Sequence, residues 1–138
     1  MSLLSDCDLI IEAVAERLAI KESVYNKIAP YIADNAYLVS NTSGLSIHSL
    51  SDVLPEKLRP RFCGLHFFNP PRYMVLTELI PHALTHESML DDLESFLTTC
   101  LGKGVIRAFD TPNFIANRIG VFSLLAMMHR AMALNIPF

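Results

Sequence analysis

Short apolar runs alternate with segments of helical spacing along most of the chain. The first run, residues 8–14, is almost fully apolar, which is typical of a strand buried on both faces. Residues 19–32 follow with apolar side chains at every fourth position, the spacing of an amphipathic helix. The same patterns predict further strands at 37–39, 62–68, 75–80 and 105–108, and further helices at 46–54 and 85–101.

The last predicted helix begins at Asp110-Thr111-Pro112, because an oxygen-bearing cap and a proline in the first turn favour a helix start. Its apolar character continues to Met132. Strands that alternate with helices are typical of a parallel sheet with helices on its faces. The sequence therefore predicts an α/β fold with a mostly parallel sheet and a long C-terminal helix.

The composition narrows the classes of function. The 138 residues suffice for one domain, and a net charge of −3 gives no basic surface, so we expect no nucleic-acid partner. No apolar run reaches the roughly 18–20 residues of a membrane span. Three scattered cysteines, Cys7, Cys63 and Cys100, have no paired spacing. They favour a reducing, cytoplasmic compartment over disulfides or a zinc site.

Polar side chains follow three of the predicted strands, at the points where the strands end. Glu16 follows the first strand, Asn41 and Ser43 follow the second, and His66 and Asn69 lie at and after the third. Ligands bind at the carboxyl ends of the strands in sheets of this kind. We therefore expect these side chains to line a cleft.

His66 lies in one apolar run and Glu78 in the next. A lone histidine in an apolar strand is more often a core residue than a catalytic one. A carboxylate inside a buried strand needs a partner, since its unpaired burial costs several kcal/mol; otherwise Glu78 faces outward from an amphipathic strand. We favour a pair in which Glu78 fixes the imidazole tautomer and raises its basicity, which predicts a proton-transfer site.

The other polar residues have simpler explanations when each is taken alone. Residues 40–44 suit either an ordinary turn with local side-chain bonds or a polar shelf for a ligand. Glu16 and Lys21 fit a carboxylate at a helix start and a solvated lysine better than a binding pair. Asn117, early in an apolar helix, must find partners and either ties elements together or faces a ligand.

Familiar catalytic motifs are missing from the sequence. It has no CxxC spacing that would hold a metal, no G-x-S-x-G elbow and no phosphate loop of the Walker A type. It also has no G-x-G-x-x-G, since the pair Gly102 and Gly104 lacks a third glycine and leads into a strand. We therefore predict no metal site.

Taken together, several pieces of the sequence resemble the 3-hydroxyacyl-CoA dehydrogenase family. The resemblance runs from about residue 6 to 130, and the His-Phe-Phe-Asn-Pro element at residues 66–70 with the later Glu78 is its specific part. The supporting pieces, in family order and approximate spacing, are Ile11-Glu12-Ala13-Val14-Ala15-Glu16 with Lys21, Ser40-Asn41-Thr42-Ser43, and Asp110-Thr111-Pro112-Asn113-Phe114-Ile115-Ala116-Asn117-Arg118.

The resemblance implies a Rossmann-like fold and the NAD-dependent oxidation of an (S)-3-hydroxyacyl-CoA to a 3-oxoacyl-CoA, as in fatty-acid β-oxidation. His66 would take the hydroxyl proton while hydride passes to the nicotinamide, and Glu78 would orient His66 and balance its charge. Ser43 and Asn117 would hold the reacting oxygen and the thioester end of the acyl-CoA substrate. The cofactor side would be lined by Glu16, Lys21, Asn41, Ser43 and Asn69.

The resemblance also implies that the chain is a central fragment. Family members begin with a strand–glycine-loop–helix unit and continue into a helical domain. We therefore expect residues 1–109 to be the second half of an NAD-binding Rossmann-like domain and residues 110–138 to start the helical domain. Such a fragment should bind NAD poorly, turn over little and associate with itself through an uncovered sheet edge and an apolar helix.

The sequence departs from the family pattern at two places. Asn113 stands where the family usually has glycine, and Pro71-Arg72-Tyr73 replaces a smoother link between His66 and Glu78. Two other functions remain open: a non-catalytic binding or assembly module, and another NAD(P)-dependent hydroxyacid dehydrogenase. A separation above about 5 Å between His66 and Glu78 would favour the non-catalytic module, because proton transfer needs hydrogen-bond reach of roughly 2.6–3.2 Å.

Overall fold

A five-stranded sheet forms the centre of the computed structural model, which describes residues 2–137. The strands lie side by side in the order in which they occur along the chain: β1 (Leu9–Glu12), β2 (Tyr37–Ser40), β3 (Phe62–Phe67), β4 (Leu76–Ile80) and β5 (Gly104–Arg107). Neighbouring strands are parallel except β3 and β4, which are antiparallel. The predicted α/β fold with a mostly parallel sheet is confirmed.

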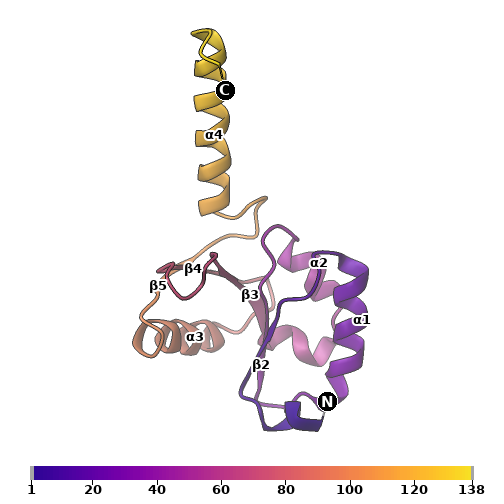
Figure 1. Cartoon of the computed structure of the whole chain (residues 1–138). Helices are drawn as coiled ribbons and strands as arrows, with labels where there is room; N and C mark the ends of the chain where they lie inside the picture. Colours follow the sequence, from indigo (N-terminus) through magenta and orange to yellow (C-terminus); the bar gives the residue numbers. More distant parts are fainter. Residues whose placement is uncertain (1, 138) are drawn as a thin grey trace.

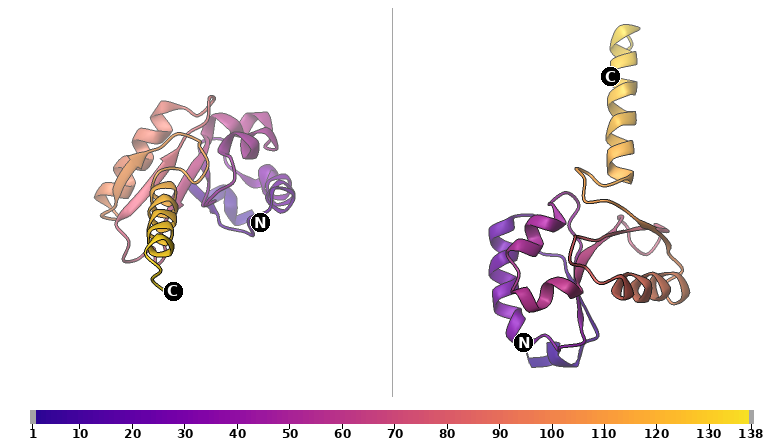
Figure 2. Two further views of the ribbon diagram at one scale, coloured as in Figure 1. Left: turned by 90° about the horizontal axis from the view of Figure 1, so that it is seen from above. Right: turned by 180° about the vertical axis from the view of Figure 1, so that it is seen from behind.

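Helices cover both faces of the sheet (Figure 1). One face packs against α1 (Leu18–Ile28), α2 (Ile47–Asp52) and the 3-10 helix η3 (Glu56–Arg61), and the other against α3 (Glu87–Thr99). There are two further 3-10 helices: η1 (Ser2–Asp6) precedes β1, and η2 (Ala29–Tyr31) continues from the end of α1. The last helix, α4 (Ala116–Ala133), projects away from the sheet, as the side view in the right panel of Figure 2 shows.

Alternating side chains of β3 divide the hydrophobic core into two parts. Phe62 packs with Tyr25 and the other residues of the α1–α2 face, whereas Cys63 and Leu65 pack with the α3 face. Gly64 lies between them, where an added Cβ would come 2.7 Å from Cδ1 of Ile47. The missing side chain therefore lets α2 approach β3 closely.

The first strand is shorter and less buried than its apolar run predicts. Only Leu9–Glu12 form β1, and the side chain of Ile11 is 46% exposed. The prediction of a strand buried on both faces is wrong, because among residues 2–137 β1 is an edge strand that pairs with β2 alone. The helix that follows ends at Ile28 instead of residue 32, since Pro30 cannot donate a backbone hydrogen bond and the chain continues as η2.

The last helix begins later than predicted. Asn113 and Phe114 have positive φ angles of 63° and 48°, and the helix starts only at Ala116. Asp110 does not cap it; its carboxylate accepts hydrogen bonds from Ser46 and from the backbone N–H of His48 at the start of α2. None of the residues of α4 is buried. Within residues 2–137 no helix has the length and apolarity of a membrane-crossing segment.

Candidate active site

The antiparallel pairing of β3 and β4 places His66 directly opposite Glu78. Nδ1 of His66 lies 2.8 Å from Oε2 of Glu78, and the two side chains are 3% and 0% exposed. The alternative of an outward-facing Glu78 is therefore wrong. The ring of His66 also packs near the rings of Phe68 and Phe114, at centroid distances of 4.5 and 5.6 Å. The two residues form a buried pair enclosed by aromatic side chains.

Glu78 has further partners at the start of the last helix. Its Oε1 accepts hydrogen bonds from the backbone N–H groups of Ile115 at 3.0 Å and Ala116 at 2.9 Å. Backbone N–H groups at the start of a helix are favourable donors to a carboxylate oxygen, so Oε1 is satisfied by the protein itself. With Oε2 of Glu78 accepting from Nδ1–H of His66, Nε2 is left as the acceptor nitrogen. Nε2 makes no hydrogen bond to a described residue.

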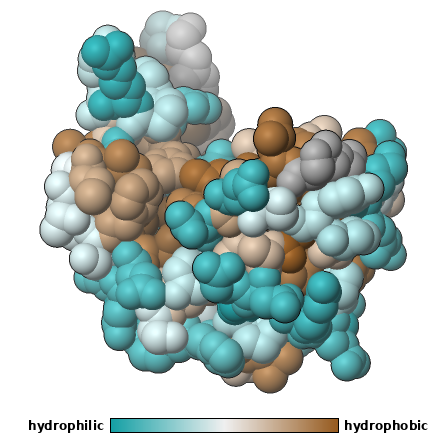
Figure 3. All heavy atoms as spheres, turned by 90° about the horizontal axis from the view of Figure 1, so that it is seen from below, coloured by the Kyte–Doolittle hydropathy of each residue, from teal (hydrophilic) through white to brown (hydrophobic). Residues whose placement is uncertain are grey.

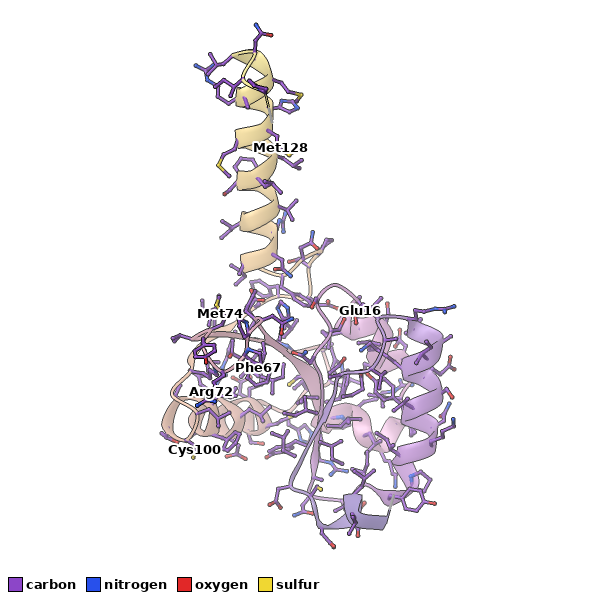
Figure 4. All side chains as sticks on the ribbon, viewed as in Figure 1. Glu16, Phe67, Arg72, Met74, Cys100 and Met128 are labelled. Atoms are coloured by element: carbon purple, nitrogen blue, oxygen red, sulfur yellow. The ribbon has the colours of Figure 1, made fainter. Side chains whose placement is uncertain are left out.

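Glu16 lies at the end of the sheet from which α4 departs (Figure 4). Its Oε1 accepts hydrogen bonds from the hydroxyl of Thr42 and from the backbone N–H groups of Ser43 and Gly44, the last two at 2.9 and 3.2 Å. Burial acts to raise the pKa of Glu16, but these bonds and the charge of Lys21 hold that pKa below its ordinary value. The loop after β2 is thus wrapped around an ionised carboxylate.

Lys21 lies inside the protein and not in solvent, so its interpretation as a solvated lysine is wrong. Its side chain is 0% exposed, and its Nζ lies 2.6 Å from Oε1 of Glu12 and 3.4 Å from Oε2 of Glu16. Glu12 is a residue that sequence reasoning missed. It carries the same signal that singled out Glu78, a carboxylate inside an apolar run.

A cleft of about 450 Å³ opens beside the carboxyl ends of β1, β2 and β3. The predicted site residues Asn41 and Asn69 line it together with Ile11, Ala13, Phe67, Pro71, Arg72, Leu101 and Lys103. Two of these lining residues, Phe67 and Arg72, are labelled in Figure 4. The side-chain oxygen of Asn41 accepts a hydrogen bond from the backbone N–H of Phe67 at 3.0 Å, which fixes the orientation of the side-chain amide. The NH₂ group of Asn41 makes no hydrogen bond to a described residue.

The structure leaves the two predicted substrate-holding residues available. Ser43 is exposed on the loop after β2, and its hydroxyl makes no hydrogen bond within residues 2–137. Asn117 follows Ala116 in the first turn of α4, is partly buried, and has no side-chain bond in the described part of the chain. The structure therefore joins His66 to Glu78 and Glu16 to the Ser43 loop, without a hydrogen bond linking the two groups.

A larger hollow of about 700 Å³ lies at the opposite end of the sheet, where β1 and β2 begin. Its lining comprises Asp6, Cys7, Asp8, Leu9, Asn35, Tyr37, Asp92, Leu93 and Phe96. Hydrophobic and hydrophilic residues are interspersed over the face seen from below in Figure 3. The hollow holds none of the predicted site residues, so its size does not make it the centre of the chemistry.

Two further chemistries can be assessed from the structure. Burial raises the pKa of the Cys63 thiol to about 12, so this cysteine stays protonated and is a poor nucleophile. Among residues 2–137 no group of three or more His, Cys, Asp or Glu side chains is arranged to hold a metal ion. The buried pair of His66 and Glu78 is therefore the candidate active site.

A family model and curated relatives identify the family of the chain. Residues 1–111 match the family model described as "3-hydroxyacyl-CoA dehydrogenase, NAD binding domain". The chain is 45% identical over all 138 residues to a "Putative fatty acid oxidation complex trifunctional enzyme" of Rickettsia prowazekii, of which it covers 19%. It is 41% identical over 127 residues, 91% of its length, to a "Probable 3-hydroxyacyl-CoA dehydrogenase" of Deinococcus radiodurans, of which it covers 37%.

Solved structures show the same similarity. The crystal structure of FadB2 from M. tuberculosis superposes with a TM-score of 0.87 and 34% identity, covering 96% of this chain and 46% of that one. A 3-hydroxybutyryl-CoA dehydrogenase from Escherichia coli gives a TM-score of 0.78 at 34% identity, covering 86% of this chain and 25% of that one. The chain thus spans less than half the length of these relatives.

Proposed function

The chain belongs to the 3-hydroxyacyl-CoA dehydrogenase NAD-binding domain family, and from that premise we propose that it carries the acid–base pair for oxidising an (S)-3-hydroxyacyl-CoA to a 3-oxoacyl-CoA. The observation that supports this proposal is the 2.8 Å contact between Nδ1 of His66 and Oε2 of Glu78. It lies within the hydrogen-bond reach that a general base and its orienting carboxylate require.

The role of His66 is to accept the proton of the substrate hydroxyl at Nε2. Glu78 stabilises the resulting imidazolium, and burial strengthens that interaction because little solvent screens it. NAD, the cofactor of this domain family, supplies the hydride acceptor when it is bound. In the reverse direction the protonated His66 returns the proton to the carbonyl oxygen of a 3-oxoacyl-CoA.

The residues of the cleft fit a dinucleotide cofactor. A volume of about 450 Å³ lies within the roughly 300–1,000 Å³ of small-molecule sites, and an apolar lining with a few amide groups suits a flat heterocycle. Asn41 and Asn69 would contact the cofactor directly. Glu16 is partly exposed beside them, whereas Lys21 would act through Glu16 because its own side chain is buried.

Ser43 and Asn117 complete the proposed substrate site. Both carry polar side chains that no described residue uses, one on the loop after β2 and one at the start of α4. In the proposal they hold the reacting oxygen and the thioester end of the acyl-CoA. Residues 1–109 then serve as half of the cofactor domain and residues 110–138 as the start of a helical domain.

The activity of this chain by itself should be low. β1 lies at the edge of the sheet, so one side of the cleft next to Ile11 and Ala13 has no neighbouring strand. We therefore propose weak NAD binding, self-association and a cytoplasmic location, although some relatives are named as mitochondrial enzymes.

NMR titration tests the proposed function even when binding is weak. Millimolar NADH should shift the amide signals of Asn41, Phe67 and Asn69, and a subsequent addition of a short 3-oxoacyl-CoA should shift the imidazole signals of His66. Any measurable NADH oxidation should fall by roughly 10²–10⁴-fold in His66→Gln. Shifts absent from the cleft at saturating NADH would overturn the proposal.

A further inference from the structure

We propose that Glu12 is a positioning residue of the site: it holds Lys21 beneath the loop of residues 42–44, and Lys21 holds Glu16, which fixes the backbone of Ser43. Glu12 and the hydroxyls around it lie outside the proposed acid–base chemistry. The use of the loop by a substrate or cofactor rests on the proposed function, whereas the positioning of the loop does not.

Glu12 is a buried carboxylate whose hydrogen-bonding capacity is taken up by its surroundings. Its Oε1 accepts from Nζ of Lys21 at 2.6 Å and from the backbone N–H of Val14 at 2.7 Å. Its Oε2 accepts from the hydroxyls of Tyr25 at 2.9 Å and Ser40 at 2.7 Å. Burial and the charge of Glu12 raise the pKa of Tyr25 far above its ordinary value, so Tyr25 remains a neutral donor.

Lys21 connects this buried carboxylate to the surface. The ammonium group has three protons, and three acceptors surround it: Glu12 at 2.6 Å, Glu16 at 3.4 Å and Ser40 at 3.5 Å. With 0% of its side chain exposed, it has no proton left for a ligand. Lys21 can therefore influence the site only through the residues it contacts.

Glu16 links Lys21 to the loop of residues 42–44. One of its oxygens faces Lys21 and the other collects the donors of Thr42, Ser43 and Gly44. The Thr42 hydroxyl in turn accepts from the N–H of Leu45 at 3.0 Å. Of the two side-chain hydroxyls in residues 42–44, that of Thr42 is engaged in the network, whereas that of the exposed Ser43 makes no hydrogen bond to a described residue.

If Glu12 only stabilised the fold, removing its charge would increase amide opening equally throughout the domain. If Glu12 positions the loop, removing its charge should increase amide opening in the loop first. When the charge of Glu12 is removed, Glu16 is the only ionised partner of Lys21 among the described residues. The ammonium group of Lys21 is then expected to move from its present position. The donors of residues 42–44 then lose a fixed acceptor. The amides of Ser43 and Gly44 should open locally more often than those of the central strand.

Amide hydrogen exchange on the full chain provides the test and needs no ligand. In Glu12→Gln we expect exchange at Ser43 and Gly44 to rise by about tenfold or more beyond any rise at Leu65 in β3. Tyr25→Phe is the matched control, because it removes one donor to Glu12 but keeps the Lys21–Glu16 link. It should show no selective rise at the loop.

An equal rise at Ser43, Gly44 and Leu65, or none at the loop, would overturn the proposal. If Glu12→Gln does not fold, Glu16→Gln takes its place, because that side chain is 44% exposed and its loss should leave the fold intact. It must then show the same selective rise at the loop, and unchanged loop exchange would equally overturn the proposal. NADH titration of the wild-type chain separately reports whether the proposed function fails.

Discussion

At the scale of single residues, Glu78 decides what His66 can do. One carboxylate oxygen contacts Nδ1 of His66 and the other contacts the first N–H groups of α4. A glutamine at this position has one oxygen and one NH₂ group. Its oxygen would stay with the two N–H donors, which outnumber the imidazole, and its NH₂ group would face Nδ1.

Glu78→Gln should therefore invert the tautomer of His66. Nδ1 would become the acceptor and Nε2 the donor, so that Nε2 could no longer take a proton from a hydroxyl. We expect turnover to fall by roughly 10²–10⁴-fold, and ¹⁵N NMR of the imidazole to show the proton moving from Nδ1 to Nε2.

Thr77→Val is the control for this change. Thr77 precedes Glu78 on β4, and its buried hydroxyl has no partner among the described residues. The variant should leave the tautomer of His66 as it is in the wild type. An unchanged tautomer in Glu78→Gln would contradict the assignment of Nε2 as the base.

Glu16 makes the stability of the chain depend on pH in a predictable direction. Its pKa in the folded protein lies below the ordinary value of 4.5, so the unfolded chain binds the proton more tightly. The stabilisation is present above pH 4.5 and is lost as the pH falls through the folded pKa. The difference in unfolding free energy between wild type and Glu16→Gln should shrink on acidification, as measured by urea denaturation; a constant difference would count against it.

At the scale of elements, α2 packs closely against β3, the strand that carries His66. An alanine at Gly64 would place its Cβ 2.7 Å from Cδ1 of Ile47 and 3.1 Å from Cδ1 of Ile80. Both atoms are ends of isoleucine side chains, so the structure can yield but only by shifting α2 or changing rotamers. The packing of α2 thus depends on a residue with no side chain.

Gly64→Ala should lower the unfolding free energy by roughly 1–3 kcal/mol, the usual cost of overpacking. Ile47→Val removes the Cδ1 atom that meets the new methyl group. The double variant should therefore lose less stability than the sum of the two single variants, as measured by chemical denaturation. Additive losses would show that Ile47 is not what resists the alanine.

The elements also show which structural features the sequence patterns could predict. Apolar runs located all five strands, and the placement of Glu78 in such a run predicted its contact with His66. The burial of Lys21 could not be predicted, because its partners Glu12 and Ser40 come from two different strands that meet only in the folded sheet. Local patterns describe a residue's neighbours in sequence and not its partners across the fold.

The prediction of where the last helix starts was wrong for a related reason. Asp110 carries the chemistry of a helix cap, and the sequence places it just before an apolar helix. In the fold its carboxylate instead accepts hydrogen bonds from Ser46 and His48 at the start of α2, which is distant in sequence but adjacent in space. The left-handed turn at Asn113 and Phe114 then delays α4 until Ala116, where Glu78 supplies an acceptor that the sequence could not assign.

At the scale of the whole molecule, α4 is the element without a packing partner. None of its 18 residues is buried, and Phe122 and Met127 are 72% and 64% exposed. An isolated helix of this length is marginal in water, because most helical stability comes from packing of an apolar face. Helix content should therefore depend on whether α4 finds another surface.

We expect the chain to associate through α4 as its concentration rises. Light scattering should report a mass above that of one chain, and the helical signal in circular dichroism should grow in parallel. Phe122→Glu should weaken the association, whereas Ser23→Glu on the exposed face of α1 adds the same charge and should not. A single-chain mass with full helicity at all concentrations would contradict this expectation.

The order of the strands has a consequence for synthesis. Each strand lies beside the one that precedes it in the chain. As the chain leaves the ribosome, each of the strands β2 to β5 can pair with a strand that has already been made. The antiparallel pair β3–β4 joins segments close in sequence, whereas the three parallel pairs span helical crossovers and form more slowly. The sheet that brings His66 to Glu78 can therefore be laid down strand by strand in the direction of translation.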